Sequence, residues 1–147
     1  ETSENDIQSA LDISQSSEFV NKKPEGIHSE INQGGTNVSG GQRQRLSIAR
    51  AIVRKPEIYI FDDSFSALDF KTDAKLREAL AASCKETKST VLLVAQRISS
   101  ILHADQIIVL DEGKMVGKGT HEELMESCKV YQQIASSQLT KEELANV

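Results

Sequence analysis

A Ser-Gly-Gly-Gln turn at residues 39–42 runs directly into a basic amphipathic stretch and has the residue types that hold a phosphate group. The adjacent glycines Gly40 and Gly41 let backbone N–H groups approach an anion closely, and Ser39 offers a hydroxyl at the N-cap of the predicted helix. That helix would direct its positive dipole end at the same place. The turn is therefore predicted to bind phosphate, with a capped helix after a tight turn as the alternative.

Two adjacent carboxylates, Asp62 and Asp63, follow a short apolar run at residues 58–61. The run comes after Lys-Pro-Glu and predicts a buried parallel strand. Ligands of α/β sheets lie at the carboxyl ends of the strands, so the acidic pair is placed to meet one. An acidic cluster at the entry of a helix is the alternative, but Asp69 already supplies the cap of the next helix.

A second apolar strand is predicted at residues 90–95 and leads into Gln96. Glutamine can donate a hydrogen bond, but it cannot carry a proton between pH 5 and 8 as histidine can. In this order and spacing, the three motifs resemble the nucleotide-binding domains of ABC transporters. The turn at residues 39–42 resembles the signature motif, and Asp62 resembles the first acid of a Walker B element.

This resemblance implies ATP and Mg²⁺ as cofactors. The signature residues would bind nucleotide, Asp62 would orient Mg²⁺ through its water shell, and Ser66 and Asp69 of a D-loop would lie at a dimer interface. Gln33, at the place of the X-loop, would couple to membrane domains, although a polar glycine turn joining two helices explains that segment equally well. The signature residues in question are Ser39, Gly40, Gly41 and Gln42.

Two positions depart from the family pattern. Asp63 stands where the family usually has a glutamate that polarises the attacking water, and Gln96 stands where it has a histidine that contacts the γ-phosphate. Both are assigned to the catalytic positions of a degenerate ATP site. The pattern resembles the degenerate half of a heterodimeric bacterial exporter of the multidrug type. Its signature would complete the competent site of a second nucleotide-binding domain, carried by a different subunit.

The sequence contains no Gly-x-x-x-x-Gly-Lys-Ser/Thr phosphate loop and no apolar run of about 20 residues. In the family both precede the signature, so the chain is expected to be the C-terminal part of a longer polypeptide with transmembrane domains. The domain would lie at the cytoplasmic face of the plasma membrane and serve export of a drug, lipid or peptide. By itself it is expected to be inactive.

Two other function classes stay open. One is a soluble ABC-type ATPase without transport, against which the exporter-like segment 113–124 and the X-loop position argue. The other is a non-catalytic interaction fragment. The net charge of −5 excludes a general nucleic-acid partner, because no basic face dominates. Cys84 and Cys128 are too few for a disulfide framework or a metal site and fit reduced thiols in the cytosol.

The 147 residues, 38% hydrophobic and 27% charged, suffice for one core of ordinary size. The alternation of helices and strands predicts an α/β fold with parallel crossovers. The resemblance implies the P-loop-NTPase-like ABC type of this fold, with a helical subdomain followed by a mainly parallel sheet and flanking helices. The expected parts are a helical subdomain at 1–55, an α/β core at 56–128 and a helical tail at 129–147. Helices are predicted at 4–15, 17–22, 70–85, 97–102 and 120–128, and strands at 58–61, 90–95, 106–110 and 115–119. The histidines His28, His103 and His121 are predicted to be surface groups, the last in a helix cap.

Overall fold

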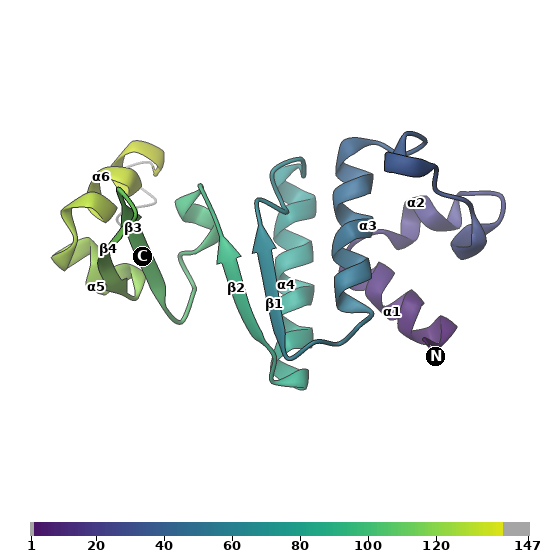
Figure 1. The fold of residues 1–147 in the computed structure, drawn as a ribbon, viewed down its shortest axis with the longest axis horizontal. Coiled ribbons are helices and arrows are strands. Elements are labelled where there is room, and N and C mark those ends of the chain that lie inside the picture. Colours follow the sequence, from purple (N-terminus) through teal and green to yellow (C-terminus); the bar gives the residue numbers. More distant parts are fainter. Residues whose placement is uncertain (1, 140–147) are drawn as a thin grey trace. The chain divides into compact units, whose positions relative to one another are not determined.

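The computed structural model describes residues 2–139, and these divide into two compact units between Leu92 and Leu93 (Figure 1). The helices are α1 (Glu4–Ile13), α2 (Ser17–Asn21), α3 (Gly40–Ile52), α4 (Phe70–Thr87), α5 (His121–Ser127) and α6 (Lys129–Gln138). The strands are β1 (Ile58–Asp62), β2 (Thr90–Val94), β3 (Ile107–Asp111) and β4 (Lys114–Gly119). Short 3-10 turns occur at Gly26–His28, Gln33–Gly35 and Ile98–Ser100. Within residues 2–139, no helix combines the length and the apolarity needed to cross a bilayer.

Helices α1 and α3 pack against each other in the first unit. Ser3 caps α1, because its hydroxyl accepts a hydrogen bond from the Asp6 N–H at 3.1 Å while the Asp6 carboxylate accepts one from the Ser3 N–H at 3.3 Å. This reciprocal pair is a capping box, and it satisfies two donors that the helix itself cannot. The buried apolar side chains are Ala10 and Leu11 of α1 and Ile48, Ala49 and Ile52 of α3.

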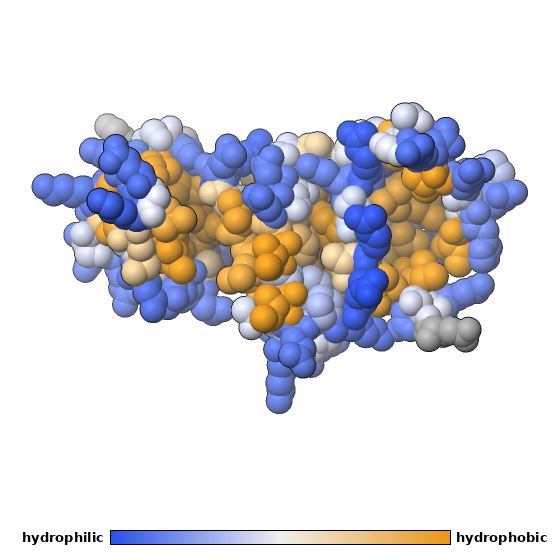
Figure 2. Space-filling model, viewed as in Figure 1, coloured by the Kyte–Doolittle hydropathy of each residue, from blue (hydrophilic) through white to orange (hydrophobic). Residues whose placement is uncertain are grey.

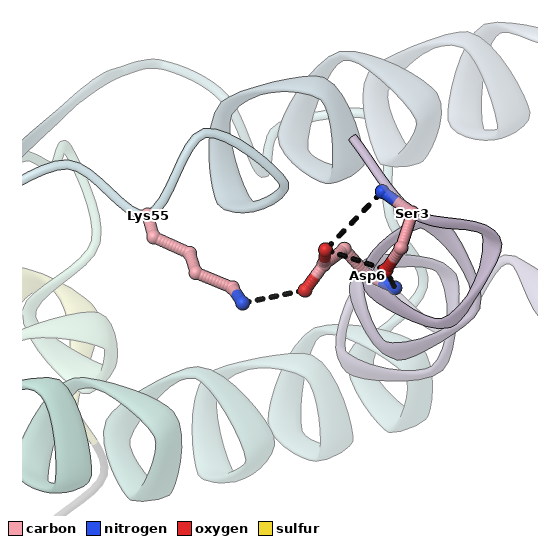
Figure 3. Close-up of polar contacts among 3 residues, drawn as sticks. All are labelled: Ser3, Asp6 and Lys55. Carbon is pink, nitrogen blue, oxygen red and sulfur yellow. Dashed lines mark hydrogen bonds and ion pairs between the residues drawn. The ribbon is translucent and has the colours of Figure 1, made fainter. Parts of the chain in front are cut away.

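An ion pair fastens the start of α1 to the segment that follows α3. Lys55 Nζ lies 2.5 Å from one carboxylate oxygen of Asp6, and Ser3 bonds to the other (Figure 3). The Lys55 hydrogen bond is the largest cause, ahead of those from Ser3, that lowers the pKa of Asp6 from 3.8 to about 2. The Asp6 carboxylate therefore stays ionised well into the acidic range, and its ion pair with Lys55 persists there.

Strands β1 and β2 form a two-stranded sheet and run in the same direction, with α4 as the connection between them (Figure 1). The side chains of β1 alternate, as a strand with one covered face requires. Tyr59 and Phe61 are buried, whereas Ile58 and Ile60 are 58% and 70% exposed. Figure 2 shows hydrophobic side chains at the surface over these strands. We call this surface of Ile58 and Ile60 the open face of β1.

The second unit is a β-hairpin that packs against two helices. Strands β3 and β4 are antiparallel, with Ile107 opposite Gly119 and Asp111 opposite Lys114, and one bulge interrupts the register. Helix α5 contacts β4, and helix α6 contacts β3. The buried core consists of Ile98, Ile107, Val109, Leu124, Cys128, Tyr131, Ala135 and Leu139.

Two glycines of β4 allow α5 to lie this close to the hairpin. A Cβ atom on Gly117 would come within 2.8 Å of Cys128 Sγ, and one on Gly119 would come within 2.7 Å of a Glu123 carboxylate oxygen. Real Cβ atoms do not approach other heavy atoms this closely, so a side chain at Gly117 would have to push α5 away. The small residues in this strand thus serve packing rather than a turn.

His121 corrects a sequence prediction. It was expected at the surface, yet it is only 4% exposed, and its Nδ1 lies 2.7 Å from the Tyr131 hydroxyl. Thr120 is the cap of α5, and the first helical residue after it turns inward. Burial lowers the pKa of His121 and raises that of Tyr131, so both groups are neutral at pH 7. His28 and His103 are exposed, as predicted.

The α/β fold class is confirmed, and the predicted helices and strands are present with ends that differ by a few residues. The predicted helix at 4–15 ends at Ile13, and that at 97–102 is a 3-10 turn of three residues. Residues 140–147 of the predicted tail lie outside the described part of the chain. The part boundaries at residues 55 and 128 stay predictions.

Candidate functional site

The predicted phosphate-binding turn forms the start of α3. Ser39 is the N-cap residue, and its hydroxyl oxygen accepts a hydrogen bond from the Gln42 N–H at 3.2 Å. The Gln42 side-chain oxygen in turn accepts one from the Ser39 N–H at 3.0 Å. These bonds use only acceptor capacity on both side chains, so the Ser39 O–H and the Gln42 NH₂ can still donate. The predicted N-cap is thereby confirmed.

Space around the turn suits an anion. No heavy atom lies within 4 Å of the position that a Cβ would take on Gly40, so this side of the turn is open. The amides of Gly40 and Gly41 belong to the first turn of α3, whose N–H groups have no partner within the helix. Two amides, one hydroxyl and the positive end of a 13-residue helix can therefore meet a phosphate here.

The arginines that follow have structural partners. Arg43 donates to the Gly34 carbonyl at 3.1 Å, and its side chain would be 2.9 Å from a Cβ on Gly35, which has φ of +69°. Arg45 donates to the Gln15 carbonyl and lies over the ring of Phe19. The segment Gln33–Gly35 is thus tied to α3 through Arg43. Gln33 itself is exposed, and its coupling role stays a prediction.

The acidic pair lies at the carboxyl end of β1, as predicted. Both Asp62 and Asp63 are exposed, and together with residues of α3 they line an open groove of about 310 Å³. Asp63 has φ of +48°, a left-handed conformation that aspartate adopts more readily than most residues. An exposed carboxylate at a strand end is a hard oxygen ligand of the kind that Mg²⁺ accepts, so Asp62 fits a magnesium site.

The loop after the acidic pair is held on its inner side by apolar anchors. Phe65 is 7% exposed and packs on Phe61 at 5.3 Å between ring centroids, with the Arg77 guanidinium 4.2 Å above its ring. Leu68 is buried as well. We refer to residues 63–68 as the β1–α4 loop.

Asp69 caps α4, as predicted. Its carboxylate accepts the Thr72 N–H at 3.0 Å and the Thr72 hydroxyl at 2.7 Å. The side-chain hydrogen bond, followed by the backbone one, lowers the pKa of Asp69. Ser66 lies three residues earlier and is an exposed residue. Whether Ser66 and Asp69 face a partner stays a prediction.

The structure brings the phosphate-binding turn and the β1–α4 loop together within the first unit. A Cβ on Gly41 would be 3.0 Å from the Ala67 carbonyl oxygen, so the glycine permits a close approach of the two backbones. Gln44, which sequence reasoning missed, bonds to the same loop at three points. The available signal was its spacing, because residues three apart on a helix share a face and Gly41 is three residues earlier.

Gln96 lies in the second unit, directly after β2. Its side chain is exposed, and its carbonyl oxygen accepts a hydrogen bond from Gln138 Nε2 at 2.8 Å. The Gln138 oxygen accepts the Ile98 N–H, also at 2.8 Å. Gln138 of α6, a second residue that the sequence did not indicate, therefore fixes the backbone that presents Gln96.

The described residues also include other metal-ligating and nucleophilic side chains. Between residues 2 and 139, no group of three or more His, Cys, Asp or Glu side chains could hold a metal ion. Cys84 and Cys128 are free thiols, and both are buried. Burial raises the pKa of Cys84, which keeps it in the unreactive protonated form.

Comparisons with known proteins agree on one family. Residues 3–66 match the ABC transporter family. The chain is 48% identical over 135 residues to an uncharacterized ABC transporter ATP-binding protein of Mycobacterium tuberculosis, a match that covers 92% of this chain and 22% of the relative. It is 40% identical over 135 residues to an ATP-dependent lipid A-core flippase of Haemophilus ducreyi, covering 92% of this chain and 23% of the flippase.

A solved structure of a bacterial Atm1-family ABC exporter with ATP bound has the same fold. The TM-score is 0.87 at 30% sequence identity, and the match covers 95% of this chain and 24% of the exporter chain. The chain thus spans about a fifth to a quarter of the length of the relatives it matches. With the phosphate-binding turn, the acidic strand end and the following loop in the order described, the chain belongs to the ABC transporter family, within its nucleotide-binding domain.

Proposed function

We propose that this chain is the C-terminal part of the ATP-binding subunit of an ABC exporter, which couples ATP binding and hydrolysis at a dimer interface to export of a substrate. The observation that carries the proposal is the turn of Ser39–Gln42, capped, open at Gly40 and packed against the β1–α4 loop. Support also comes from the likeness to an exporter with ATP bound and from the relative named as a lipid A-core flippase.

In this proposal, the turn binds the γ-phosphate of an ATP molecule whose other contacts come from a second nucleotide-binding domain. The amides of Gly40 and Gly41 and the Ser39 hydroxyl donate to phosphate oxygens, and the Gln42 amide adds a further donor. The capping box holds these donors in place before the nucleotide arrives, so little reorganisation accompanies binding.

The acidic end of β1 serves the other ATP site of the dimer. Asp62 would hold Mg²⁺ through water, and the ion supplies positive charge against the phosphates when bound. Asp63 takes the position of the water-polarising carboxylate, and Gln96 that of the γ-phosphate contact. Because Asp63 is one methylene shorter than glutamate and Gln96 cannot carry a proton at neutral pH, we assign slow or absent hydrolysis to this site.

The proposed partners follow from this division. A different subunit supplies the second nucleotide-binding domain with the competent glutamate, and transmembrane domains belong to the same polypeptide as this chain. The domain then lies at the cytoplasmic face of the plasma membrane. Gln33, on the segment tied to α3 by Arg43, is the proposed contact toward the membrane domains.

The test uses the complete transporter that carries this chain. Ser39→Arg or Gly40→Asp places bulk or negative charge where the γ-phosphate binds, so steady-state ATPase activity should fall at least tenfold. Asp63→Asn should change it less than twofold, because its own site already contributes little. Equal losses from the two kinds of substitution would show that the assignment of the sites is wrong.

A further inference from the structure

One side chain of α3 holds the β1–α4 loop from the outside. Gln44 Nε2 donates to the Ser66 hydroxyl at 3.1 Å and to the Asp63 carbonyl at 3.4 Å, and Gln44 Oε1 accepts the Ala67 N–H at 2.9 Å. Ser66 also donates to the Asp63 carbonyl at 3.1 Å. A single amide group thus spans the loop from its first residue to its fifth.

Gln44 contacts the outward side of the loop, where its residues are exposed. Phe65 and Leu68 anchor it toward the core, whereas Asp63, Ser66 and Ala67 are exposed. Asp63 also has the left-handed φ of +48°, which costs free energy unless neighbouring contacts hold it. The Gln44 side chain bonds the exposed part of the loop to α3.

A second observation places the same two elements in contact. Gly41 approaches the Ala67 carbonyl so closely that a Cβ would lie 3.0 Å from it. Gln44 comes one helical turn later and accepts the N–H of that same Ala67. Helix α3 therefore contacts Ala67 at two points, with Gly41 at its carbonyl and Gln44 at its N–H. We expect a displacement of the turn or of the loop to move the other.

We propose that Gln44 is a positioning residue that links the two ATP sites of the dimer. The inference rests on the proposed function, in which the turn at the start of α3 serves the partner's ATP and Asp63 serves the ATP on this subunit's own side. Phosphate bound at Ser39–Gln42 sets the position of α3, and Gln44 passes this position to the loop that carries Asp63. The coupling acts equally in the reverse direction, as any coupling between two binding equilibria must.

The bonding pattern requires an amide, since the side chain is donor and acceptor at once. Gln44→Met keeps the length and removes both functions. Gln44→Glu keeps the acceptor for the Ala67 N–H and can accept from Ser66, but it cannot donate to the Asp63 carbonyl. The two variants have nearly the same side-chain volume. They differ in that Gln44→Glu keeps the bond to the Ala67 N–H and Gln44→Met loses it.

The contact itself is tested by amide hydrogen exchange on the 147-residue chain. In Gln44→Met the Ala67 amide should exchange at least tenfold faster, whereas in Gln44→Glu it should stay within about threefold of the native rate. The Thr72 amide, which Asp69 caps, is the internal reference. Gln132→Met is the matched control, because it removes a comparable bond, to the Met125 carbonyl, in the other unit. Unchanged Ala67 exchange in Gln44→Met would overturn the proposal.

The linkage is tested by ATPase kinetics of the complete transporter. Because the Asp63 site itself contributes little turnover, the expected effect runs from the loop to the turn of Ser39–Gln42, which serves the competent site of the partner. Gln44→Met should therefore lower kcat at least tenfold and leave KM for ATP within twofold, since Gln44 supports this turn without touching nucleotide. Gln44→Glu should recover part of kcat, a rescue that a merely structural loss would not show. A rise in KM with unchanged kcat would overturn the linkage. An inactive native transporter would instead overturn the proposed function, while the exchange result would still decide the role of Gln44.

Discussion

Asp63 combines two features that bear on its proposed catalytic role, a short carboxylate and a left-handed backbone. Aspartate is among the residues that tolerate this conformation, because its side chain can bond locally. A longer glutamate reaches further toward an attacking water, yet it must adopt the same backbone at a higher cost. The backbone conformation at residue 63 thus affects how far a carboxylate reaches, in addition to the length of its side chain.

Restoring Asp63→Glu together with Gln96→His should raise hydrolysis at this site more than either change alone. The glutamate moves the carboxylate by one methylene toward the water, and the histidine supplies a group that can carry a proton. Displacements of about 1 Å can cost a hundredfold in rate, so geometry decides the size of the gain. The measurement is single-turnover hydrolysis in a dimer whose partner lacks its own catalytic glutamate. A rate equal to that of the native chain would mean that these two residues do not limit the site.

At the residue scale, the sequence predicted the roles of residues that bond to partners a few positions away in the chain. Ser39 and Asp69 cap helices through bonds to residues three positions later, so their local pattern reveals them. The residues it missed bond over longer separations. Gln44 meets a loop about 20 residues away, and Gln138 bonds to a carbonyl 42 residues away. Only the fold brings such partners together.

The burial of His121 is a further property that its local sequence did not predict. The Thr-His-Glu-Glu sequence is typical of a solvated capping box, and the box is present. What decides the burial of His121 is Tyr131 on the next helix, because its hydroxyl pairs the imidazole nitrogen inside the core. A cap motif predicts where a helix begins, but not which of its first side chains points inward.

At the scale of elements, helix periods and apolar runs predicted nearly all of the secondary structure. The run at 58–61 was predicted to be a buried strand, and this is wrong for Ile58 and Ile60, which lie on an exposed face of β1. The side-chain bonds between these elements could not be predicted from the sequence. The bond between Asp6 and Lys55 joins residues 49 apart, and neither residue has a pattern that indicates the other.

Lys55→Met should raise the pKa of Asp6 from about 2 toward 3.8, although the bonds from Ser3 keep it below that value. The folded pKa is the depressed one, so the interaction stabilises the fold above about pH 4 and is lost as the pH falls toward 2. The measurement is an NMR titration of the Asp6 carboxyl carbon. Lys22→Met, which removes the ion pair with Glu18 instead, should leave the Asp6 titration unchanged. An unaltered Asp6 titration in Lys55→Met would exclude the ion pair in solution.

At the scale of the whole molecule, the motifs of the chain are those of one nucleotide-binding domain of the ABC family. It has the phosphate-binding turn and the acidic strand end, but its sequence lacks the phosphate loop whose amides and lysine supply most contacts to ATP in this family.

The chain by itself should accordingly bind Mg-ATP weakly, with a dissociation constant above the micromolar range, and should not hydrolyse it. A helix N-terminus alone offers attraction on the order of 1 kcal/mol, far below the roughly 8 kcal/mol that micromolar binding requires. Calorimetric titration with Mg-ATP measures this directly. A micromolar dissociation constant would show that the turn and the acidic pair bind ATP without a phosphate loop.

The open face of β1 also affects how this chain behaves in solution. Ile58 and Ile60 alternate along one side of the strand, and β3 likewise leaves Ile108 and Leu110 more than half exposed. Exposed apolar side chains on one face of a short sheet favour association of chains through that face. The chain should therefore be prone to aggregation in solution, and a charged substitution at Ile60 should raise its solubility.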